Sequence, residues 1–123
     1  MKVGLNTMIF RATFTDKDYE IFAPIKDMGF DGVEIGLEKK GDIDYDRCRK
    51  ELEKNGLENS SVCGLFGEDR DIRGPNKEHI ETGKAYIKDL IDAASELGSG
   101  LVSGPLYSAV GRANFETDEA KKE

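Results

Sequence analysis

The sequence predicts an α/β fold whose sheet is parallel and built from alternating strands and helices. Three times a helical segment ends in glycine and an apolar run follows at once or after a short break, at Gly29-Phe30, Gly56-Leu57 and Gly98–Leu101. Such regular alternation implies parallel strands joined by right-handed crossovers. The last apolar run, Leu101–Ser103, breaks into Gly104-Pro105 and a polar loop. Strands end in this way at the C-terminal rim of α/β sheets, where these folds bind ligands.

The first half of the chain holds two of the predicted strands and the first helix. Short apolar runs predict strands over Lys2–Met8 and Phe30–Leu37. Between them we expect a helix that begins at the N-cap residue Thr15, with acids in its first turn, and runs to about Met28. Pro24 lies inside this segment and predicts a kink or a split, because proline removes a backbone donor.

The second half continues the same alternation. Asp44 is the predicted N-cap of a helix that ends at Asn55-Gly56, and the third strand is expected near Ser60–Leu65. Asn76 is the predicted N-cap of the third helix, which precedes the fourth strand at Leu101–Ser103. This third helix has the strongest apolar periodicity in the chain, at three- and four-residue steps through Ile80, Gly83, Ile87, Leu90, Ile91, Ala94 and Leu97.

Composition excludes several classes of partner. The chain has 123 residues, enough for one ordinary domain, which we place at residues 1–123. Its formal net charge is −7 and it has no run of Lys and Arg, so binding to nucleic acid or to an anionic membrane surface is not expected. No stretch approaches the ~20 apolar residues of a membrane span. The N-terminus lacks a signal-peptide pattern, so we expect a cytoplasmic protein.

The chain offers few groups with metal or nucleophile patterns. Cys48 and Cys63 have no paired spacing and are read as reduced thiols. His79 is the only histidine, and in the first turn of a charged helix we expect it to be exposed, so a zinc site is not expected. Three acids in the loop 67–75 suggest a metal, but two arginines lie among them, which favours a solvated, self-neutralised loop: Glu68, Asp69, Arg70, Asp71 and Arg73.

Two α/β architectures fit four parallel strands: an open flavodoxin-like sheet, or half of an eight-stranded barrel, which needs ~250 residues when complete. A flavodoxin-like sheet would place a phosphate loop after the first strand. The segment Ile9–Phe14 has no glycine and two phenylalanines, whereas a phosphate cradle needs exposed backbone amides. The half-barrel is therefore the favoured prediction.

Four stretches carry a resemblance to a known family. They are Met1–Gly4, Met28–Ile35, Ser61–Leu65 with Asp69–Ile72, and Gly104–Gly111, which includes the sequence GPLYS. Together they resemble the N-terminal half of the ketose 3-epimerases, the tagatose, allulose and ribulose 3-epimerase group among the xylose isomerase-like TIM barrels. The resemblance covers nearly the whole chain and implies the (βα)3β portion of such a barrel.

The resemblance implies C3 epimerisation of a free ketose through a cis-enediolate, with Mn²⁺ or Co²⁺ holding O2 and O3 and two glutamates moving the proton. The family's metal ligands and both glutamates lie in the second half of the barrel, so no catalytic or metal-binding residue is expected here, and the chain alone is expected to be inactive. Substrate contacts implied for this half are Asn6, Cys63, Gly64, Pro105 and Leu106. The family's usual aromatic residue at the first position is replaced by Asn6, and the chain has no Trp.

Glu34 is a candidate that the strand itself suggests, because it interrupts an apolar run between Val33 and Ile35. A carboxylate that points into a barrel needs a partner. It is read either as a contact to the sugar or to another site residue, or as a hydrogen-bonded structural acid near the rim.

Other functions and features remain open at this point. The chain also fits another enzyme of the superfamily, such as a hydroxypyruvate isomerase or an inosose dehydratase, or a non-catalytic half-barrel that associates with itself. Four parallel strands leave two edges that invite pairing, so we expect a homo-oligomer. Residues 116–123 read either as the start of a helix or as a charged tail.

Overall fold

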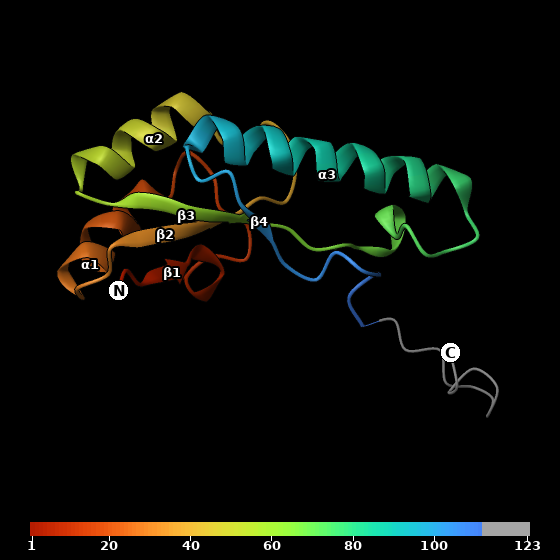
Figure 1. Cartoon of the computed structure of the whole chain (residues 1–123), viewed down its shortest axis with the longest axis horizontal. Coiled ribbons are helices and arrows are strands. Elements are labelled where there is room, and N and C mark those ends of the chain that lie inside the picture. Colours follow the sequence, from red (N-terminus) through yellow and green to blue (C-terminus); the bar gives the residue numbers. More distant parts are fainter. Residues whose placement is uncertain (112–123) are drawn as a thin grey trace.

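In the computed structural model, residues 1–111 are described. They form one parallel sheet in the order β1-β2-β3-β4 (Figure 1). Its strands are β1 (Gly4–Asn6), β2 (Gly32–Gly36), β3 (Glu58–Cys63) and β4 (Val102–Ser103). Neighbours in sequence are neighbours in the sheet, as in a barrel wall, whereas a flavodoxin-like sheet would place the second strand at the edge. The predicted parallel α/β architecture is confirmed.

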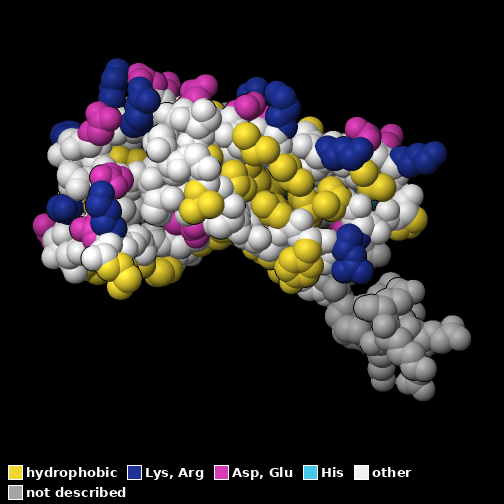
Figure 2. All heavy atoms as spheres, viewed as in Figure 1, with side chains coloured by type: hydrophobic (Ala, Val, Ile, Leu, Met, Phe, Trp, Pro, Cys, Tyr) yellow, Lys and Arg dark blue, Asp and Glu magenta, His cyan; other side chains and the backbone are white. Residues whose placement is uncertain are grey.

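Three α-helices connect the strands: α1 (Phe22–Asp27), α2 (Tyr45–Lys54) and α3 (Lys77–Leu97). In Figure 1, α2 and α3 lie side by side along the sheet. Their outer surfaces carry the charged side chains that the composition predicts, as Figure 2 shows. Helices and strands share one core, in which the largest fully buried side chains are Phe14, Phe22, Ile25, Val33, Ile35, Leu52, Val62, Phe66 and Leu90.

The N-terminal third departs most from the prediction. The first strand ends at Asn6, because the Asn6 side chain accepts a hydrogen bond from the Met8 backbone and starts a 3-10 turn over Thr7–Ile9. The expected helix from Thr15 is wrong. Asp18 accepts hydrogen bonds from both the backbone and the hydroxyl of Thr15, which closes a turn there instead.

The first helix is therefore short and begins only after a 3-10 turn over Tyr19–Ile21. Pro24 lies in its first turn, where the missing backbone donor has no helical partner to lose. The proline thus neither kinks nor splits the helix.

The caps predicted for the two longer helices are confirmed. The Asp44 side chain accepts from the Arg47 backbone at the start of α2, and the Asn76 side chain accepts from two backbone amides at the start of α3. Gly98 ends α3 with φ of 90°, a left-handed conformation that glycine adopts without strain. On α3 the prediction is wrong for Ile91, which is 55% exposed, whereas Tyr86 is buried.

The prediction that loop 67–75 is solvated also needs correction. Arg70 is 8% exposed and Asp71 is 3% exposed, so the expectation of a solvated loop is wrong for both. A 3-10 turn over Glu68–Arg70 packs against α3 and carries Arg70 inward. His79, expected to be exposed, is half-buried beside a pocket of about 520 Å³.

A β-bulge interrupts the pairing of β2 with β3. Gly32 and Val33 pair with Glu58 and Asn59, but Glu34 pairs with Ser61, so Ser60 is the extra residue. The buried Asn59 side chain donates hydrogen bonds to the carbonyls of Val33 and Ser61 on both sides of the bulge. Bulges re-aim side chains, and this one aligns Ser61 with Glu34.

Within residues 1–111, β1 and β4 each have one neighbouring strand. Self-association through these edges stays a prediction. The expectation for 116–123 lies outside the described residues. In the described part of the chain no helix is long and apolar enough to cross a membrane.

Candidate functional site

The two faces of the sheet differ in chemistry. Val33, Ile35 and Val62 point to the helices and are fully buried in the core. Successive strand residues point to opposite faces, so Glu34 lies on the other side. That face carries polar side chains from the middle to the C-terminal end of the four strands: Asn6 of β1, Glu34 of β2, Ser61 and Cys63 of β3, and Ser103 of β4.

Glu34 is the centre of this group. One carboxylate oxygen, Oε1, accepts from Nδ2 of Asn6 at 2.5 Å. The other, Oε2, accepts from Oγ of Ser103 at 2.6 Å and from Oγ of Ser61. A single carboxylate therefore joins side chains from each of the four strands, and we call these four residues with Cys63 the Glu34 cluster.

The hydrogen bonds keep Glu34 ionised. Partial burial raises the pKa of its carboxyl, but the bonds from Ser103, Ser61 and Asn6 outweigh burial and hold the pKa below its ordinary value. A general base works best with a pKa near the operating pH. Glu34 is thus suited to orienting its neighbours rather than to carrying a proton.

Asn6 connects the cluster to the rim. Its Nδ2 donates to Glu34, while its Oδ1 accepts from the Met8 backbone. The 3-10 turn over Thr7–Ile9 has a second hydrogen bond to β2, in which the Gly36 backbone donates to the buried Thr7 hydroxyl at 3.0 Å. The partners of Asn6 therefore distinguish its amide nitrogen from its amide oxygen, and the side chain has one orientation.

Cys63 lies beside Asn6, Ser103 and Glu34. Burial, and then the negative charge of Glu34, raise the pKa of its thiol, so it is neutral near pH 7. The other cysteine, Cys48, is buried in the helix-covered core, and burial raises the pKa of its thiol to about 12. Both cysteines are free, and neither has the lowered pKa of a nucleophile.

The remaining predicted contacts lie just past the strands. A side chain at Gly64 would collide with Leu90, its Cβ falling 2.4 Å from Cδ1, so the strand passes close under α3. At Gly104, φ is 119° and a Cβ would lie 1.9 Å from the Gly64 carbonyl oxygen. Pro105 and Leu106 follow and are half-buried, and Leu106 packs against the core.

The structure thus brings Asn6, Glu34 and Cys63 into one cluster and places Gly64, Pro105 and Leu106 beyond the strand ends. Sequence reasoning missed Ser61 and Ser103, which supply two of the three bonds to Glu34. Ser103 has a local signal, since it ends the fourth apolar run. Ser61 has none, because its direction depends on the bulge at Ser60.

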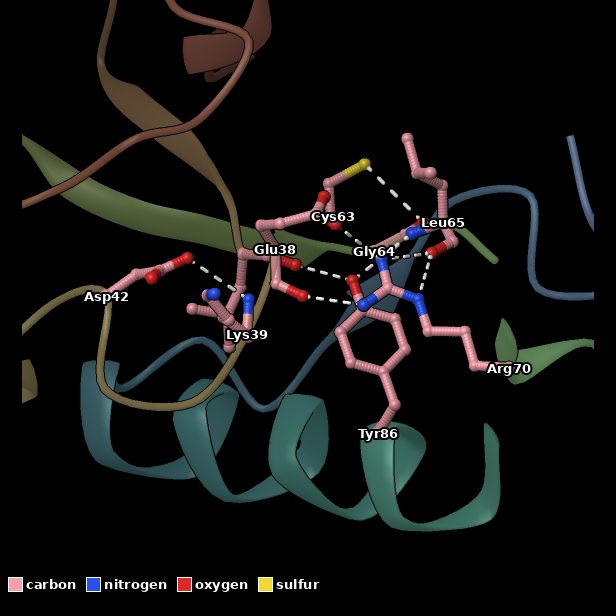
Figure 3. Close-up of polar contacts among 9 residues, drawn as sticks. Glu38, Lys39, Asp42, Cys63, Gly64, Leu65, Arg70 and Tyr86 are labelled. Carbon is pink, nitrogen blue, oxygen red and sulfur yellow. Dashed lines mark hydrogen bonds and ion pairs between the residues drawn. The ribbon is translucent and has the colours of Figure 1, made fainter. Parts of the chain in front are cut away.

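A second group of polar contacts braces the rim from the helix side (Figure 3). The guanidinium of Arg70 lies over the Tyr86 ring, 3.7 Å from its centre. It donates to the carbonyl oxygens of Leu65, at 2.8 and 3.1 Å, and Glu38, at 2.7 Å. The Tyr86 hydroxyl donates to the carbonyl of Leu37. These bonds satisfy the carbonyls that follow β2 and β3, where the ladder has ended.

The described residues do not fit a metal ion by themselves. Across residues 1–111, no three side chains of His, Cys, Asp or Glu lie together so that they could hold one. The acids of loop 67–75 do not form such a group, because Asp71 accepts instead from the backbones of Arg73 and Ala109.

Comparison with known proteins decides the family. Residues 22–122 match the family described as xylose isomerase-like TIM barrel. The chain belongs to this family. Strands β2, β3 and β4, which are parallel and adjacent in sequential order, lie within the matched residues.

Three similar proteins are ketose 3-epimerases by name. A probable ketose 3-epimerase of Synechocystis sp. (strain ATCC 27184 / PCC 6803 / Kazusa) is 26% identical over 111 residues, which are 90% of this chain and 38% of that protein. The structure of D-allulose 3-epimerase from Methylomonas sp. superposes with a TM-score of 0.84 at 18% identity, covering 99% of this chain and 43% of that one. An L-ribulose 3-epimerase structure gives 0.81 at 24% identity, with coverages of 98% and 41%. The chain thus spans about two fifths of the length of these relatives.

Proposed function

We propose that this chain forms the N-terminal wall of the sugar site of a ketose 3-epimerase. The observation that carries the proposal is the Glu34 cluster, whose Asn6, Cys63 and Ser103 lie at the C-terminal ends of parallel strands, where barrel enzymes bind their substrates. The relative and the two structures named above support it, because all three are ketose 3-epimerases by name.

The chemistry of the wall suits a polyhydroxylated ligand. Asn6, Ser61, Ser103 and the Cys63 thiol are neutral, short and able to donate or accept. Ligand sites place a few such groups to orient the bound molecule. In this proposal Asn6 and Cys63 meet the sugar hydroxyls, Glu34 holds them in place or meets a hydroxyl itself, and Gly64, Pro105 and Leu106 shape the wall and exclude water.

Proton transfer at C3 is assigned to residues other than those described. Glu34 is engaged by three donors and its pKa is lowered, so it is poorly placed to remove or return a proton. In the proposal, two glutamates and the ligands for Mn²⁺ or Co²⁺ come from the part of the barrel that residues 1–111 do not form. The metal would polarise the ketose carbonyl. The isolated chain is accordingly proposed to bind a ketose weakly without converting it.

The proposal can be tested by binding. Amide resonances of the ¹⁵N-labelled chain would be followed by NMR during titration with D-allulose or L-ribulose, with sorbitol as a control polyol that has no carbonyl. We expect the largest shifts at Asn6, Cys63 and Gly64, and weaker binding in Ser103→Ala. Ser99→Ala, at the opposite end of β4, is the matched control and keeps wild-type binding. Shifts confined to other surfaces would refute the proposal.

The alternatives give different results in the same experiment. A hydroxypyruvate isomerase or an inosose dehydratase would respond to hydroxypyruvate or to an inosose in place of the ketoses. A self-associating half-barrel would give a discrete dimer in native mass spectrometry and no response to any of these ligands or to Mn²⁺.

A further inference from the structure

We propose that Glu34 is a positioning residue of this site: its carboxylate sets the orientation of the Asn6 amide and keeps Cys63 a neutral thiol. The wall then presents a fixed set of neutral polar groups to the ligand. The ligand role rests on the proposed function, whereas the coupling between Glu34, Asn6 and Cys63 can be tested without any sugar.

The Asn6 amide is held by one hydrogen-bond partner at each end. A side-chain amide can be turned end for end, and its hydrogen-bond partners decide which end points where. Here an acceptor, the Glu34 carboxylate, lies 2.5 Å from Nδ2, and a donor, the Met8 backbone, lies 2.7 Å from Oδ1. Without the carboxylate, only the Met8 bond would hold the amide, and the Thr7–Ile9 turn would lose one of its two attachments to β2.

The Cys63 thiol lies beside a negative charge. Glu34 is the only charged group that the structure places near this thiol among the described residues, and the neutral Tyr86 hydroxyl is the other titratable neighbour. An anion beside a thiol disfavours the thiolate. The Cys63 sulfur lies 4.0 Å from the Gly64 carbonyl oxygen, a distance at which a protonated thiol donates and a thiolate would be repelled.

The Glu34 carboxylate is itself held in place by two hydroxyl groups. Ser61 on β3, the strand beside β2, and Ser103 on β4, the next strand along the sheet, both donate to Oε2. Ser61 reaches it because of the bulge at Ser60, which the buried Asn59 side chain bridges. The bulge and the two hydroxyls therefore hold the Glu34 carboxylate in one orientation. The carboxylate in turn holds the Asn6 side chain in one orientation.

The test measures the reactivity of Cys63 directly. The chain would be alkylated with iodoacetamide between pH 6 and 10, and modification at Cys63 and Cys48 would be quantified separately by peptide mass spectrometry. In Glu34→Gln we expect the pH midpoint for Cys63 to fall, so that its alkylation near pH 8 rises several-fold, because the thiolate no longer forms beside an anion. Glu34→Asp keeps the charge and should largely restore the wild-type midpoint.

Glu58→Gln is the matched control, because it removes the same charge from the other end of β3, where Glu58 is exposed and paired with Lys2. Its Cys63 midpoint should equal that of the wild type. Loosening of the fold would instead raise the alkylation rate at every pH and expose Cys48 as well. Equal midpoints in Glu34→Gln and Glu58→Gln would overturn the proposal.

A second measurement needs no variant and covers the case in which Glu34→Gln fails to fold. In an NMR pH titration of the wild-type chain, the Asn6 side-chain amide resonances should follow the titration of the Glu34 carboxyl. If they do not, the positioning role is refuted. If the coupling is present but ketoses bind elsewhere, the coupling stands and the proposed function falls.

Discussion

The two faces of the same four strands use opposite chemistry. On the helix-covered face, Val33, Ile35 and Val62 are fully buried and make no polar contact through their side chains. On the other face, Glu34 and its three partners make a network of hydrogen bonds, in which Ser61 is buried and the other three residues are partly exposed. Alternation along a strand lets one segment contribute to the core and to a site at once. The apolar core and the polar cluster are thus separated by a single residue step along the strand.

The largest expected effect comes from the helix-covered face. Ile35→Ala should lower the free energy of unfolding by about 2–5 kcal/mol, because it removes buried methylenes and leaves a cavity. Urea denaturation measures the change. Ser60→Ala, at the exposed bulge on the other face, is the control and should stay within about 0.5 kcal/mol of wild type. Similar losses in both variants would contradict the division between the faces.

Removal of the Arg70 side-chain contacts should cause the second largest loss of unfolding free energy. Arg70→Met keeps an unbranched apolar stem but leaves the carbonyls of Leu65 and Glu38 without their donor, so we expect a loss of about 1–3 kcal/mol. Lys84→Met on the exposed side of α3 serves as the control and should have little effect. If both variants unfold at the same urea concentration, the carbonyls have found other partners and the brace does not stabilise the rim.

On the polar face, the effect should be smaller and local. Ser103→Ala removes one donor to Glu34 and should loosen β4, whose ladder spans only two residues, at a cost of about 1 kcal/mol. Hydrogen exchange of backbone amides measures this loosening of β4. The Gly64 amide, which donates to the Ser103 carbonyl, should exchange faster, while the Leu37 amide, which donates to the Cys63 carbonyl, should not change. Faster exchange at both amides would mean that the sheet opens as one unit.

The same contrast explains what the sequence could predict. Asp44, Asn76 and Gly98 act on backbone groups within a few residues, so their caps are readable from local sequence. Thr15 has the same kind of signal, but Asp18 takes its backbone donor for a turn, and the expected helix is lost. Competing local hydrogen bonds of this kind look alike in sequence.

Contacts between residues that lie far apart in the sequence could not be predicted from local sequence patterns. Arg70 is buried because it contacts the carbonyls that follow β2 and β3 and the ring of Tyr86, which lies 16 residues later in the sequence, on α3. Nothing near Arg70 in sequence distinguishes it from a solvated loop residue. On the polar face, Glu34 was predicted because a charge in an apolar run is conspicuous, whereas Ser61 faces it only because of a bulge that breaks the two-residue period.

The smallest expected effect concerns pH and isolates the charge of Glu34. Its folded pKa is lowered, so its ionised form adds stability that is present above the unfolded pKa, about 4.3, and is lost as pH falls through the folded pKa. Glu34→Gln lacks this contribution. The difference in unfolding free energy between wild type and Glu34→Gln should therefore shrink as pH falls below about 5, while the difference for Ile35→Ala stays constant. A gap for Glu34→Gln that does not depend on pH would mean that shape rather than charge holds the polar face together.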